Sequence, residues 1–394
     1  MNYYKLPAGV QDVLPEEYYN LSLLSRRLEE KFRLAGCRFV QSSALEYYDT
    51  FAEIRNRIPQ RTMFKMTDGD GALLVLRPDM TLAVSRIAAT KLKDEKARLA
   101  YIGEIWNNSE ATGNLSQREI LQAGVEFLGE EGAFSDARII AFAVECMQAA
   151  GLSDFTVDVG HVGFFKGLLS GAGLSESLTE RIRVAINAKD SIGATMLLKE
   201  SGVGGRAAEA VQALPSLFGG EEVFARAEKL TDDPTALAAI AHLRKVHRLL
   251  KRFGCENYVS FDLGAVKSLS YYSGIVFTGL TKALGAAVLS GGRYDRLADD
   301  FGKHIPAVGF AMGLKRILIA LERDGKVCTP PPPYAVIVAG PGAEAEAYAE
   351  YLRLTADGKT ADLWTGGYED GLAYAKRKSP EVILVATEKG VEKI

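Results

Sequence analysis

The sequence predicts an α+β protein with an antiparallel sheet and flanking helices, a helical insertion, and a small C-terminal α/β domain. Three observations predict it. Strand-like runs joined by hairpin-length or irregular links occur in the first 160 residues and return after residue 257, which favours an antiparallel sheet. A long stretch rich in Ala, Leu and basic residues, with few strand signals, separates the two groups of strands. A run of four prolines then precedes an alternation of strand and helix patterns.

The first half of the chain mixes helices and strands. A helix is expected from Leu21, because the apolar positions up to Phe32 follow helical spacing and Gly36 can end the helix. A second helical pattern covers residues 80–92. The strands expected here are residues 37–42, 71–76, 99–106, 123–128 and 155–160.

The second half suggests where the domains divide. Residues from about 165 to 252 form the expected helical insertion, and strands are expected again at 258–263, 274–277 and 286–289, so that the core spans residues 1–325. Residues 326–333 contain the proline run, a stiff linker that cannot continue a helix. Residues 334–394 have the pattern of a βαβαβ unit with a parallel sheet.

Composition excludes several classes of protein. The net charge of -3 does not favour binding of a polyanion such as nucleic acid. The chain has neither an apolar signal core nor an uncharged run long enough for a membrane span. The four cysteines contain no C-x-x-C pair, and His242 and His247, five residues apart, do not share a helical face. We therefore expect a cytoplasmic protein without a metal, a cofactor or a membrane partner.

Six short segments carry the strongest functional signal, among them Arg77-Pro78-Asp79-Met80-Thr81 and Gly291-Gly292-Arg293-Tyr294-Asp295. All six are residues 6–15, 76–81, 122–126, 269–274, 291–295 and 307–316. In this order they resemble the motifs of the histidyl-tRNA synthetase family. The resemblance implies a class II aminoacyl-tRNA synthetase-like antiparallel sheet, and it makes residues 334–394 similar to a shortened anticodon-binding domain.

The chain departs from that family where the family places its cations. Asn107 stands where the second motif has an arginine, Ser109 stands where that arginine has an acidic neighbour, and Lys267 replaces the arginine of the histidine-specific segment. A fixed guanidinium stabilises the charge that develops on the α-phosphate during adenylation, and losing one such donor costs roughly 2.7–4 kcal/mol. We therefore expect negligible adenylation and no catalytic residue.

The residues that the resemblance assigns to histidine binding are better preserved. The ammonium of free histidine suits Asp79, Thr81 and Gln122, and its imidazole suits Glu126 with a hydroxyl from Tyr271 or Tyr272. Only one of these tyrosines is expected to line the pocket, because successive strand residues face opposite sides, and we favour Tyr272.

Other interpretations of these residues stay open at this point. Lys267, Arg293 and Arg316 could be vestigial nucleotide or anion contacts. Alternatively, Arg293 could form a local salt bridge after a tight Gly-Gly turn at a strand end, and Arg316 could be solvated. Glu126 could belong to a structural ion pair instead of a binding site.

The chain thus lacks the cations that would bind the nucleotide but keeps the residues that would bind the amino acid. This combination resembles one branch of the family, the regulatory subunits of ATP phosphoribosyltransferase. Residues 158–165 also resemble this branch. The resemblance implies a self-dimer that joins the short-form catalytic subunit in a hetero-oligomer, a hetero-octamer, that is required for activity and relays histidine feedback inhibition without binding tRNA. The alternatives are an active histidyl-tRNA synthetase and a synthetase-like protein that uses the pocket for an unrelated purpose.

Overall fold

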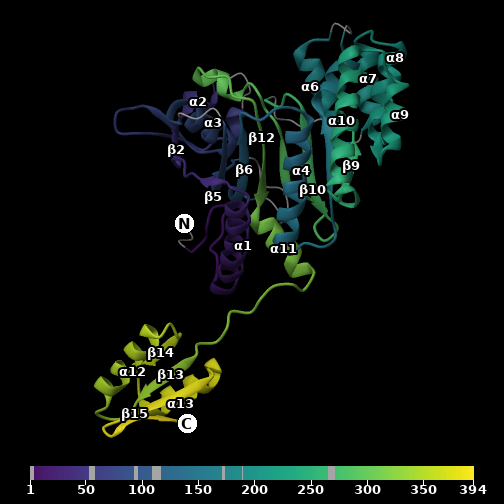
Figure 1. Ribbon diagram of the computed structural model, residues 1–394. Coiled ribbons are helices and arrows are strands. Elements are labelled where there is room, and N and C mark those ends of the chain that lie inside the picture. The colour runs from purple at the N-terminus through teal and green to yellow at the C-terminus, as the bar shows by residue number, and fades with distance from the viewer. Residues whose placement is uncertain are drawn as a thin grey trace. The chain divides into compact units, whose positions relative to one another are not determined.

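The computed structural model describes residues 4–52, 58–92, 96–108, 117–170, 174–188, 190–264 and 271–394. The chain divides into two compact units, Met1–Val327 and Cys328–Ile394 (Figure 1). The first unit contains a nine-stranded and a three-stranded sheet, and the second contains a four-stranded sheet. In this described part of the chain, no helix has the length and apolar character needed to cross a membrane.

The nine-stranded sheet has the order β1-β5-β6-β12-β11-β10-β7-β9-β8. The strands are β1 (Arg38–Phe39), β5 (Ala97–Trp106), β6 (Glu119–Leu128), β7 (Phe155–His161), β8 (Phe218–Gly219), β9 (Val259–Asp262), β10 (Ile275–Thr281), β11 (Ala287–Arg293) and β12 (Ala307–Gly313). Its central pairs are antiparallel, as predicted, whereas β1 pairs with β5 and β7 pairs with β9 in parallel. The strands β8 and β12 were not among those expected from the sequence.

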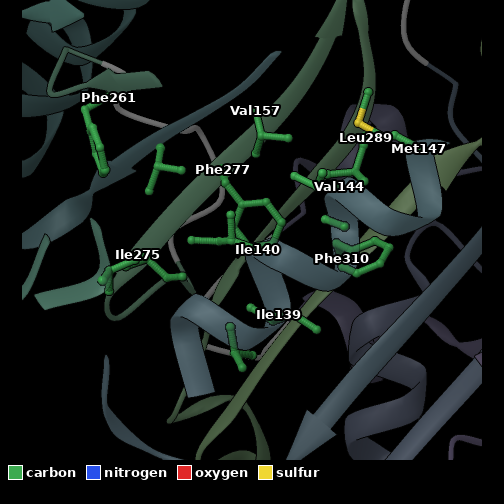
Figure 2. Close-up of a cluster of buried hydrophobic side chains, with 14 of the residues drawn as sticks. Ile139, Ile140, Val144, Met147, Val157, Phe261, Ile275, Phe277, Leu289 and Phe310 are labelled. Atoms are coloured by element: carbon green, nitrogen blue, oxygen red, sulfur yellow. The ribbon is translucent and has the colours of Figure 1, made fainter. Parts of the chain in front are cut away.

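One face of this sheet is covered by three helices, α1 (Pro15–Leu34), α4 (Gly132–Ala149) and α11 (Leu314–Arg323). Figure 2 shows the middle of this core, where Ile140 and Val144 of α4 lie beside Phe277 and Phe310 of the sheet. The helix α1 begins six residues before the predicted start, because Pro15 suits the first position of a helix and two glutamates follow in the first turn.

The other face carries a second apolar cluster, which includes residues of α3 (Met80–Lys91). A three-stranded sheet precedes α3, formed by β2 (Leu45–Tyr47), β3 (Lys65–Thr67) and β4 (Leu73–Leu76), together with the short helix α2 (Tyr48–Ala52). The described residues of the unit also form the 3-10 helices η1 (Gln60–Thr62), η2 (Leu214–Ser216), η3 (Glu256–Tyr258) and η4 (Leu297–Phe301).

The stretch predicted as a helical insertion contains helices, together with the two-residue strand β8. These helices are α5 (Val162–Leu168), α6 (Glu176–Asn187), α7 (Ser191–Glu200), α8 (Gly205–Ala213), α9 (Glu222–Glu228) and α10 (Pro234–Arg252). Asp233 caps α10 by accepting hydrogen bonds from two backbone amides, and α10 buries Leu243, Val246 and Leu250. It packs against α4 and α5, which attaches the insertion to the core.

The second unit has the predicted alternation of strands and helices. It consists of β13 (Ala335–Ala339), α12 (Glu344–Ala356), β14 (Ala361–Trp364), α13 (Tyr368–Lys378), β15 (Val382–Thr387) and β16 (Gly390–Lys393). The strand β13 lies between β14 and β15 and is parallel to both. The sequence analysis did not include β16, which adds an antiparallel edge to β15.

Candidate functional site

The register of the central strands places several polar side chains on the face away from α1, α4 and α11. Tyr101 of β5 lies opposite Gly124 of β6, and Glu126 lies opposite Gly309 of β12. Because side chains alternate between the faces of a sheet, Tyr101, Gln122 and Glu126 share one face. Over this face α3 begins, which brings Asp79 and Thr81 to the same place.

Glu126 is the centre of this group. It is 1% exposed, and its carboxylate accepts hydrogen bonds from Thr81 Oγ1 at 2.8 Å, from Tyr101 Oη at 3.4 Å and from the hydroxyl of Tyr294. Burial raises the pKa of Glu126 to about 8, although these hydroxyls oppose the shift. Within the described residues no basic side chain forms an ion pair with it, which argues against a structural ion pair.

Asp79 is the second acid of the site. One carboxylate oxygen caps α3 by accepting a hydrogen bond from the Leu82 amide at 2.7 Å. Burial raises the pKa of Asp79 to about 6, and the nearby Asp79 charge in turn raises the pKa of Glu126. Two acids that lack a basic partner in the described parts of the chain form a site that favours a cationic ligand.

Both tyrosines of the pair at residues 271–272 belong to this site. Each is buried, their ring centroids are 4.8 Å apart, and the Tyr271 centroid is 6.0 Å from that of Tyr294. The expectation that only one of them faces the site is wrong, because they precede β10 and lie outside any strand. Burial and the nearby Asp79 charge raise the pKa of both phenols, which keeps them as hydroxyl donors.

Glycines make room for these groups. A Cβ on Gly309 would lie 1.7 Å from Glu126 Oε2, and a Cβ on Gly292 would lie 2.5 Å from Tyr272 Cε1. The Gly291-Gly292 pair lies within β11 and forms no tight turn, so that alternative is wrong. These glycines are needed because side chains of the site approach the sheet backbone closely.

Arg293 does not join the site. It lies on the opposite face of the sheet, two residues beyond Gly291, whose register partner Phe310 faces α4. There its Nε donates to Asp136 Oδ1 at 2.8 Å and its Nη1 donates to Asp295 Oδ1 at 2.9 Å. The expectation of an anion contact at Arg293 is therefore wrong, and the alternative of a local salt bridge with Asp295 is confirmed as part of a larger cluster.

The other two predicted cations remain untested as anion contacts. Arg316 is half-buried on α11 and its Nη1 donates to the carbonyl of Ala287 at 2.9 Å. Lys267 and Ser109 lie outside the described residues. Across the described ranges of the chain, no group of three or more His, Cys, Asp or Glu side chains could hold a metal ion.

The sequence analysis missed three residues on this face. Tyr101 and Tyr294 bind Glu126, and Tyr294 stands within the quoted motif at residues 291–295, which was the available signal for it. Arg118 directly precedes β6, and its carbonyl accepts a hydrogen bond from the amide of Asn107 at 2.8 Å. Alternation along β6 puts Arg118 on the same face as Gln122, so a cation does lie close to the position where the family's arginine is missing.

Comparisons with known proteins place this geometry in context. The profile of the family described as histidyl-tRNA synthetase matches residues 9–317. The ATP phosphoribosyltransferase regulatory subunit of Acetivibrio thermocellus is 43% identical over 320 residues, which are 81% of this chain and 76% of that protein. The regulatory subunit of the same name from Thermoanaerobacter pseudethanolicus is 36% identical over 383 residues, which are 96% of this chain and 98% of that protein.

A solved structure has the same fold over almost the whole chain. It is described as an ATP phosphoribosyltransferase regulatory subunit/histidyl-tRNA synthetase from Bacillus halodurans C. The two structures superpose with a TM-score of 0.86 at 29% sequence identity, covering 98% of this chain and 99% of the other.

Proposed function

This chain belongs to the family of ATP phosphoribosyltransferase regulatory subunits, which has the histidyl-tRNA synthetase fold, and on that premise we propose that it binds free histidine and relays feedback inhibition to the catalytic subunit. The class II synthetase-like fold expected from the motifs is confirmed by this likeness. A regulatory role within the phosphoribosyltransferase complex follows from the family itself.

The observation that carries histidine binding is the pair of buried acids, Asp79 and Glu126. Free histidine supplies what they lack, a compact cation with several N–H donors. The ammonium suits Asp79, Thr81 and the Gln122 amide, which has no hydrogen-bond partner among the described residues. The imidazole N–H suits Glu126, and the tyrosine rings provide flat apolar surfaces to pack against it.

Feedback requires that histidine bind two states of the complex with unequal affinity. Glu126 holds together three parts of the fold, since its partners Thr81, Tyr101 and Tyr294 come from α3, from β5 and from the segment after β11. A ligand that draws on Glu126 therefore changes the contacts between these parts. We propose that the histidine-bound arrangement belongs to the less active state of the complex.

The assembly itself is part of the proposal. The chain forms a dimer and joins the short-form catalytic subunit in a hetero-octamer that is required for transferase activity. Co-purification of the native complex, followed by light scattering of the complex and of the isolated chain, tests this arrangement. If a protein other than a phosphoribosyltransferase chain co-purifies in stoichiometric amounts, the pocket serves an unrelated purpose and the proposal fails.

Histidine affinity is expected to rise between about pH 6.5 and pH 8. Because burial raises the pKa of Glu126 to about 8, the free site holds a proton below that pH, and a cationic ligand must displace it. Binding at pH 7 should therefore release protons, which calorimetry in buffers of different ionisation enthalpy measures directly. The Glu126→Gln variant, which has no proton to release at this position, is the matched control. An identical proton count for both proteins contradicts this prediction.

An active histidyl-tRNA synthetase remains the second candidate, since Arg118 lies on the site face and the solved relative carries both names. We expect histidine-dependent ATP–pyrophosphate exchange at least about 10²-fold below that of a working synthetase, because Asn107 cannot stabilise the developing phosphate charge. We also expect no measurable tRNA binding at physiological salt, because residues 331–394 contain 7 Lys and Arg against 10 Asp and Glu. Exchange at the rate of a synthetase, or submicromolar tRNA affinity in filter binding, favours the second candidate.

A further inference from the structure

A cavity of about 820 Å³ lies away from the histidine site. It is bordered by residues 9–13, by α1 and α11, and by the ends of β5 and β6 nearest Trp106 and Glu119. Ile102 and Leu121 line it, and these residues alternate with Tyr101 and Gln122 along their strands. The cavity therefore opens on the opposite face of the sheet from Glu126, and we call it the back groove.

The floor of the back groove is apolar. Leu21 of α1, Ile102 and Leu121 of the sheet, and Leu318 of α11 line it. One large aromatic side chain on its rim, Tyr18, is 67% exposed. Exposed apolar surface around a hollow of this size is typical of a binding site.

The polar lining is acidic. Four glutamates line the back groove, whereas Lys315 is the single basic residue in the described lining, and it pairs with Glu17 at 3.1 Å. Glu119 and Glu322 are exposed and form no ion pair with a described residue. The groove thus has an apolar floor under a surplus of negative charge, which is complementary to a segment that carries Lys or Arg beside an apolar side chain.

The charge also selects between two occupants. A twofold dimer contact on the groove would bring the same acidic patch of two copies together, and like charges across an interface oppose association. A different chain with a basic segment meets no such repulsion. We propose that the back groove docks a basic segment with an apolar anchor from the phosphoribosyltransferase catalytic subunit. This inference rests on the proposed function for the identity of the partner.

The test reverses charge on the rim without touching the floor. The double variant Glu119→Lys/Glu322→Lys should bind the catalytic subunit about tenfold more weakly at low salt, and the difference should shrink as ionic strength rises. The matched control is Glu200→Lys/Glu209→Lys, which makes the same charge change at exposed positions of α7 and α8. A third variant, Tyr18→Ser, should weaken the complex with little salt dependence because it removes apolar contact area.

Affinity is measured by calorimetry with the purified catalytic subunit, and each variant is also measured for histidine binding and for self-association by light scattering. We expect histidine binding to remain unchanged, because the groove and the histidine site lie on opposite faces. If the unmodified chain does not bind the catalytic subunit, the proposed function fails. If it binds and the rim variant matches its control, only the docking inference is overturned. Loss of self-association with unchanged partner affinity would show that a second copy occupies the groove, which also overturns it.

Discussion

Replacement of Glu126 by Ala is expected to weaken histidine binding at least about a hundredfold, since a buried, charge-assisted hydrogen bond contributes roughly 1.5–3 kcal/mol and the ligand also loses its neutralising charge. Glu126→Gln keeps the volume and one acceptor oxygen, so its effect should be intermediate if recognition of the imidazole is electrostatic. Calorimetry on the isolated chain gives both affinities. In the reconstituted complex, inhibition should require more histidine with Glu126→Gln than with the unmodified chain, and still more with Glu126→Ala.

The control for Glu126→Ala is the exposed Glu200→Ala, for which both affinity and inhibition should stay unchanged. Assembly is checked by sedimentation, and each inhibition curve is compared with the uninhibited rate of the same variant. A well-assembled Glu126→Ala complex with unaltered histidine sensitivity, although its isolated chain no longer binds histidine, would falsify the sensor proposal. In that case feedback acts through the catalytic subunit alone.

Replacement of Asp136 by Ala is expected to lower the free energy of unfolding of the first unit by about 3–5 kcal/mol. Asp136 is 0% exposed, receives two charged contacts from Arg293, and lies 2.7 Å from Nε2 of His242 on α10. Its removal leaves the Arg293 guanidinium buried without its main counter-charge. Urea unfolding monitored by tryptophan fluorescence and circular dichroism measures the loss.

The double variant Asp136→Ala/Arg293→Met separates charge from packing. Because it removes both members of the buried pair, it should be more stable than Asp136→Ala alone. A double variant that is no more stable than the single one would mean that the pair contributes mainly through shape. His242→Ala should cost less than Asp136→Ala, since the carboxylate keeps its contacts with Arg293.

The sequence predicted those helices and strands in which apolar residues recur at a regular spacing within one segment. Apolar residues at helical spacing gave α3 to within one residue and α1 except for its first six residues, and apolar runs gave β5, β6 and β7. The sequence analysis overlooked β12 and β16, because β12 is buried on both faces and rich in glycine and β16 is a short edge strand. Their existence depends on the partners beside them, and a single segment does not specify its partners.

For the histidine site too, the sequence determined some features and the tertiary structure determined others. The sequence by itself determined the family motifs, the acids Asp79 and Glu126, and the missing arginine at Asn107, since each of these follows from residue type at a quoted position. Only the tertiary structure decided that Tyr101 and Tyr294 bind Glu126, that both Tyr271 and Tyr272 are included, and that Arg293 faces the other way. The physical reason is that a strand presents alternate residues to opposite faces, so the facing of a strand residue depends on where the strand begins and on which strand lies beside it. Tyr271 and Tyr272 escape this alternation because they precede β10. The register that pairs Glu126 of β6 with Gly309 of β12 joins residues more than a hundred positions apart, and it is fixed by packing of the whole sheet.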